Sequence, residues 1–135
     1  MNRIDRTVDI CIGGKMRKMR FNINSIVELE RRIPEKNIFV LMQKGAFPLE
    51  SLIAATWAGL KYQDKFLDIK TVTRWVDEYL AQHSYQKLFA LVYGAIGLSG
   101  LMHKDVSLFE DIIKKANALD DADEEESEEG TDPKN

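Results

Sequence analysis

The chain has 135 residues, which is the length of one domain, and its composition of 44% hydrophobic and 30% charged residues is ordinary for a globular protein with a core. The net charge of −3 hides an asymmetry, because residues 120–135 carry nine acidic and one basic side chain, whereas residues 1–119 carry 18 basic and 13 acidic ones. The single Cys11 excludes an intrachain disulfide framework and a multi-cysteine zinc site, and we interpret it as a small, half-buried strand residue.

Residues 6–22 have the pattern of a β-hairpin around Gly13 and Gly14, because both central positions of a two-residue turn favour a positive φ. A tight turn places the apolar side chains of both strands on one face: Val8, Ile10, Ile12, Met19 and Phe21. The same register puts Asp9 opposite Lys18, which is a favourable cross-strand pair. A two-stranded ribbon is marginal alone, so we expect this apolar face to pack on helices or on another chain.

Five or six amphipathic segments follow, and most begin at a residue that commonly caps or starts a helix. Their expected starts are Asn22 or Asn24, Ile38, Pro48, Asp68, Ser84 and Ser107, the last in a capping box with Glu110. The fifth segment is apolar on nearly all sides, as a central helix is. The sequence thus predicts a mainly α (α+β) fold in which residues 1–119 form one domain, with the hairpin packed on a bundle of five to six helices.

The longest apolar run, residues 88–102, is shorter than the roughly 18 to 20 residues of a membrane-spanning helix, and Gly94, Gly97 and Gly100 interrupt it. The start of the chain has no apolar run typical of a signal peptide. We therefore expect no membrane partner and a cytoplasmic location.

Residues 120–135 are acidic and bury too little apolar surface to offset chain entropy, so they are predicted to form a disordered acidic tail. Three interpretations of this tail remain open. It keeps the protein in solution, it shields or mimics the charge of a partner, or its composition follows from a constraint on the coding sequence.

Residues with catalytic or ligand-binding chemistry do not form a recognisable constellation. Neither His83 nor His103 lies near a second histidine or cysteine at metal-ligand spacing, and no serine has a nucleophile-elbow context. The Gly13-Gly14-Lys15 segment is not a phosphate-binding loop, because a strand follows it rather than a helix. We therefore predict no enzyme activity, no catalytic residue, no cofactor and no metal.

The predicted second strand carries four cations: Lys15, Arg17, Lys18 and Arg20. They favour either nucleic-acid binding or an edge strand protected by charge. The second interpretation is preferred, because no helix has a basic recognition face and the acidic tail would oppose DNA. Arg31 and Arg32 suit a helix C-terminus, and Trp57 and Trp75 occupy apolar helix stripes typical of a core.

Three stretches carry a recognisable packing pattern. Residues 21–30 combine an aromatic strand end, a polar cap and a Leu-Glu helix start, residues 49–60 follow L-x-x-L-x-x-x-x-W-A-G-L, and residues 71–80 form the next helix. Together, over residues 8–102, they resemble the phage tail assembly chaperone family, including the related gene transfer agent tail proteins. The acidic C-terminus also fits this family.

The resemblance implies a protein that coats the tape measure protein and recruits tail tube subunits in the host cytoplasm, and that is not part of the mature virion. It also implies a longer form made by programmed ribosomal frameshifting. Self-association is left open as a further interaction. The candidate partner-binding residues lie on the sixth predicted helix and the tail: Phe109, Ile112, Ile113, Asp120, Asp121, Asp123, Glu124, Glu125 and Glu126.

Each part of this hypothesis has an alternative. The apolar face of the sixth helix is also explained by ordinary docking onto the body. The whole chain is also compatible with a structural tail or connector subunit of the virion, or with a small DNA-binding phage regulator that uses the basic hairpin.

Overall fold

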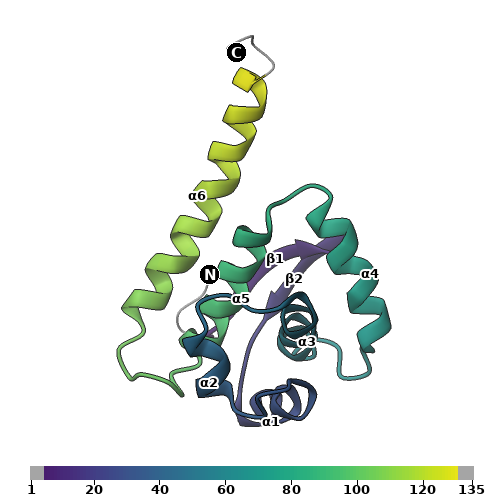
Figure 1. Cartoon of the computed structure of the whole chain (residues 1–135), viewed down its shortest axis with the longest axis vertical. Coiled ribbons are helices and arrows are strands. Elements are labelled where there is room, and N and C mark those ends of the chain that lie inside the picture. Colours follow the sequence, from purple (N-terminus) through teal and green to yellow (C-terminus); the bar gives the residue numbers. More distant parts are fainter. Residues whose placement is uncertain (1–4, 131–135) are drawn as a thin grey trace.

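The computed structural model describes the backbone of residues 5–130 and the side chains of residues 5–119. Over this part of the chain, a two-stranded antiparallel sheet precedes six helices (Figure 1), which confirms the predicted mainly α (α+β) fold. The elements are β1 Val8–Ile12, β2 Lys15–Met19, α1 Ile23–Arg32, α2 Ile38–Gln43, α3 Leu49–Leu60, α4 Ile69–Leu80, α5 Tyr85–Leu98 and α6 Ser107–Gly130.

The hairpin has the predicted register, with Asp9 opposite Lys18 and an ion pair of 2.8 Å between their side chains. Gly13 and Gly14 form its turn with φ of 65° and 83°. The predicted apolar face is buried throughout. Cys11, however, is exposed rather than half-buried.

The outer edge of β2 is covered by the end of α3 and the residues that follow it. The backbone N–H of Lys18 donates to Oε1 of Gln63 at 3.0 Å, and that of Arg20 donates to the carbonyl of Gly59 at 3.1 Å. Because an unpaired strand edge is a template for aggregation, these bonds protect one side of the hairpin.

Most helices begin where the sequence places a cap. The side chains of Asn22, Asp68 and Ser84 each accept a hydrogen bond from the backbone N–H three residues later. The start of α6 differs from the prediction, because Ser107 is its first residue rather than its cap. Instead, the Asp105 carboxylate accepts the Ser107 backbone N–H at 3.0 Å.

Helices α3 and α5 form the centre of the core. Helix α3 contacts α1, α4, α5 and β2, and α5 contacts α3, α6 and β1. Both helices are buried on nearly all sides, as their composition predicts. Trp57 of α3 lies in the core, while Trp75 of α4 is partly buried beneath the hairpin turn.

Helix α6 packs along α5, and its second half extends away from the other helices (Figure 1). The helical backbone continues through residues 120–130, which begin the segment predicted to be disordered. The side chains of residues 120–130 and the whole of residues 131–135 lie outside the described residues, so the disordered acidic tail stays a prediction.

The cap of α4 provides a test of pH dependence. Hydrogen bonds from the Thr71 side chain, and then from its backbone N–H, lower the pKa of Asp68 below its ordinary value of 3.8. A carboxylate whose pKa is lowered by folding stabilises the fold above pH 3.8, and this contribution disappears as the pH falls through the lower, folded pKa. Asp68→Asn keeps an oxygen acceptor but cannot titrate.

We therefore expect the wild-type chain to be more stable than Asp68→Asn at neutral pH, and the difference to vanish in strong acid. Urea unfolding of both proteins across the acid range measures it, and the paired comparison cancels the titration of the other carboxylates. A difference that stays constant down to the lowest pH would contradict this role of Asp68.

Candidate protein-binding surfaces

The contact between α5 and α6 is shaped by two glycines. Phe109, Ile113 and Ala116 are spaced by four and three residues along α6, and all three are buried. A Cβ atom on Gly97 would lie only 2.0 Å from Cδ1 of Phe109, and one on Gly94 only 2.5 Å from Cγ1 of Ile113. The absence of side chains on α5 therefore creates the space that the large side chains of α6 fill.

This contact places three of the predicted partner-binding residues. Phe109 and Ile113 are buried against α5, and Ile112 is partly buried. The apolar face of α6 thus docks onto the body of its own chain, which is the alternative interpretation of this helix. Partner binding through Phe109 and Ile113 would require α6 to leave α5, and it stays a prediction.

The six acidic residues predicted to bind a partner lie farther along α6. They belong to the part of the helix that runs beyond the other elements (Figure 1). Their side chains are outside the described residues, so the structure brings them together with Phe109 and Ile113 only by placing all of them on one helix.

An aromatic row runs along α5 and ends at α6. Tyr85, Phe89 and Tyr93 follow one another at one-turn spacing, with ring centroids 5.9 and 5.4 Å apart, and Phe109 continues the row 5.9 Å from Tyr93. The Tyr85 hydroxyl fixes the loop before α3 by donating to the carbonyl of Phe47 at 2.6 Å. Removing α6 would therefore uncover the end of a continuous apolar row on α5.

A second surface is basic and lies where α1 packs on α3. The indole of Trp57 makes cation–π contacts with two side chains. The guanidinium carbon of Arg32 lies 4.4 Å from the ring centroid, and the ammonium of Lys61 lies 4.6 Å from it. Lys61 also forms a 2.8 Å ion pair with Glu28. With Arg31 these residues line a shallow pocket of about 540 Å³. We refer to Arg31, Arg32, Trp57 and Lys61 as the basic surface.

The basic surface is not predicted from the sequence. The separate predictions for its residues are confirmed, because Arg31 and Arg32 occupy the last turn of α1 and Trp57 is a core residue that is only 5% exposed. The available signal was the spacing of four residues between Glu28 and Arg32 and between Trp57 and Lys61, which puts each pair on one helix face. Only the packing of α1 against α3 shows that the two faces meet.

The cations of β2 are largely engaged within the hairpin. The Arg17 guanidinium donates to the carbonyl of Ile12 at 2.8 Å and lies 4.0 Å from the Trp75 ring centroid. The Lys18 ammonium binds Asp9, whose carboxylate raises the pKa of Lys18 through a hydrogen bond and its charge. These contacts account for Arg17 and Lys18 within the fold, and the choice between an edge strand and phosphate binding stays a prediction.

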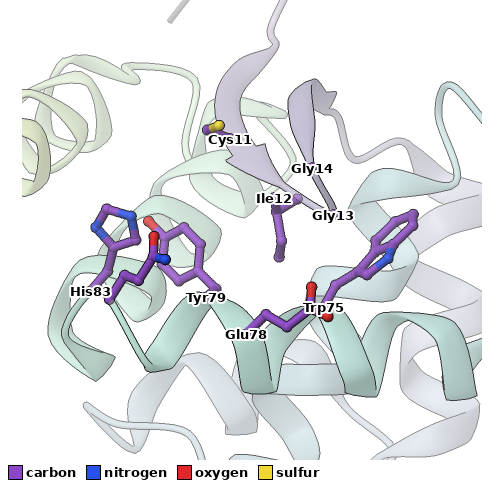
Figure 2. A pocket seen from close by; sticks show the side chains of 9 residues that line it. Cys11, Ile12, Gly13, Gly14, Trp75, Glu78, Tyr79 and His83 are labelled. Atoms are coloured by element: carbon purple, nitrogen blue, oxygen red, sulfur yellow. The ribbon is translucent and has the colours of Figure 1, made fainter.

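A second hollow, of about 380 Å³, lies between the hairpin turn and α4. Figure 2 shows Trp75 and Glu78 rising from α4 on one side, Tyr79 and His83 on the other, and Cys11 on the strand above. The rings of Tyr79 and His83 lie 4.4 Å apart. We assign this hollow to the contact of the hairpin with α4, because the turn rests directly on Trp75.

Comparison with protein-family models, curated proteins and solved structures finds no match to this chain. Within the described residues, no group of three or more histidine, cysteine, aspartate or glutamate side chains is placed to hold a metal ion. In the same part of the chain, no helix combines the length and apolar character needed to cross a membrane.

Proposed function

We propose that this chain is a tail assembly chaperone of a phage or prophage, which binds the tape measure protein and recruits tail tube subunits without catalysing a reaction. It acts in the host cytoplasm and is absent from the mature virion. The observation that carries this proposal is the α5–α6 contact, in which a helix occupies a surface that two glycines shape for it. Such a surface recognises helices, the expected form of a long tape measure segment.

In the proposed mechanism, α6 is a replaceable occupant of α5. It makes its extensive contacts with α5, so its displacement leaves the packing of the hairpin and of α1 to α5 in place. A client helix with large apolar side chains four residues apart, followed by a small one three residues later, would repeat the pattern of Phe109, Ile113 and Ala116. It would then cover the aromatic row that α6 leaves exposed.

The test is co-expression of the full chain with the tape measure protein encoded beside it. Soluble co-purification is expected with the wild-type chain. Phe109→Ala weakens the docking of α6 but leaves the α5 surface open, so client binding should persist or increase. Gly97→Ala also disturbs α6, but it fills the α5 surface itself, so client binding should fall.

The two variants loosen the same intramolecular contact, so a loss of client binding with Gly97→Ala alone separates binding on α5 from general destabilisation. A client that stays insoluble with the wild-type chain would end the chaperone proposal. Equal losses with both variants, or none with either, would show that the client does not bind on α5. Abundant copies of the chain in purified virions, detected by mass spectrometry, would favour a structural tail subunit instead.

A further inference from the structure

The basic surface has an unbalanced charge. Three cations and one carboxylate line its pocket, and Glu28 is already paired with Lys61. Among residues 5–119, no carboxylate forms an ion pair with Arg31 or Arg32, and both arginines are exposed. The surface therefore favours an anionic partner.

The geometry of Arg32 suits carboxylates in particular. Its guanidinium carbon lies 4.4 Å from the Trp57 ring centroid, so the indole restrains the group through a cation–π contact. A guanidinium held in this way still presents N–H donors at its edge, and their fork matches a carboxylate. Lys61 lies against the same ring and supplies a second cation.

The chain itself contains a matching anion. Residues 120–135 carry nine acidic side chains and one basic one, while residues 1–119 have a net positive charge. In Figure 1, the backbone of residues 120–130 continues α6 away from the body, toward the end of the molecule opposite α1. The backbone of residues 120–130 therefore does not lie over the basic surface of its own chain, whereas the acidic segment of a neighbouring copy is free to do so.

We infer that the basic surface binds the acidic segment, residues 120–135, of a second copy of this chain. Each copy offers one basic surface and one acidic segment at opposite ends, so the contact is heterologous and joins copies head to tail in an open series. This inference does not depend on the identity of the client. Because the charges are exposed, the association should be strong at low ionic strength and screened at high salt.

The first experiment is sedimentation velocity of the full chain between about 0.01 M and about 1 M salt, where the screening length falls roughly tenfold. Species larger than the monomer are expected at low salt and should dissociate at high salt. A chain that remains monomeric at the lowest salt, or whose oligomers resist the highest salt, would overturn the inference.

Two variants test the surfaces separately. Arg31→Glu with Arg32→Glu reverses the basic surface but keeps the acidic segment, and Glu124→Gln, Glu125→Gln and Glu126→Gln together weaken the segment but keep the surface. Each variant alone should lose the larger species. When the two variants are mixed, the acidic segment of the first should bind the basic surface of the second. The resulting one-to-one complex should grow no further, because it has no other functional surface or segment.

The matched control is Lys70→Glu with Arg74→Glu, which makes the same charge change on the exposed face of α4. It should associate as the wild-type chain does. Equal loss of association in this control would show that net charge rather than the basic surface drives the effect. Failure of the two surface variants to form a complex when mixed, while both remain folded by circular dichroism, would also reject the inference.

Discussion

Gly97→Ala is expected to detach α6 from α5 and to lower the free energy of unfolding by about 2 to 4 kcal/mol. The new methyl group would lie 2.0 to 2.3 Å from three ring carbons of Phe109, so the ring cannot keep its place. Losing the burial of a phenylalanine costs about 3 to 5 kcal/mol. Alanine returns only about 1 kcal/mol through its higher helix propensity, so the loss of packing prevails.

Hydrogen exchange provides the local measurement. Backbone amides of residues 109–116 should lose protection in Gly97→Ala, while those of α3 should keep it. A double-mutant cycle supplies the control. In the Phe109→Ala background the new methyl group of Gly97→Ala meets no ring, so the double variant should be as stable as Phe109→Ala alone or slightly more stable. Additive losses in this cycle would mean that the methyl group and the ring do not compete for one space.

Gly13→Ala is expected to lower the free energy of unfolding more than Gly14→Ala does. The difference should be about 1 to 3 kcal/mol, which is the usual cost of overpacking. Both glycines have a positive φ, so alanine at either position carries a left-handed backbone cost of about 1 to 2 kcal/mol. Only at Gly13 does a Cβ atom collide with another side chain, at 2.5 Å from two ring carbons of Trp75. At Gly14 it meets open space.

The difference between these variants isolates the contact of the turn with α4. Urea unfolding of both proteins gives it directly, and Gly14→Ala is the matched control for backbone strain. Trp75→Ala should remove most of the difference, because it removes the ring that the methyl group strikes. Equal stability of Gly13→Ala and Gly14→Ala would show that the turn shifts away from Trp75 without cost.

The parts of the fold that sequence predicts best are governed by local chemistry. The Gly13-Gly14 turn fixes the strand register, and Asn22, Asp68 and Ser84 mark helix starts by accepting nearby N–H groups. Burial of Cys11 is predicted wrongly for a different reason. Alternation along a strand identifies two faces but does not say whether the second face is covered.

The candidate surfaces depend on packing between helices that sequence patterns leave unspecified. Periodicity identifies Phe109 and Ile113 as one apolar face, but their neighbour is unknown until α6 is placed on α5. Gly94 and Gly97 look like interruptions of an apolar run in the sequence, whereas in the structure they receive those two side chains. The basic surface likewise exists only because α1 crosses α3 at Trp57.

The position of the hairpin also determines when this protein can fold during its own synthesis. Arg6, just before β1, donates a 2.6 Å hydrogen bond to the carbonyl of Ser99, 93 residues later, and β1 packs on α5. At roughly 5 to 20 residues per second, a ribosome needs about 5 to 20 s to make the intervening chain. These strands thus keep part of their apolar face uncovered until α5 has emerged, and a nascent chain that stops before α5 cannot complete its core.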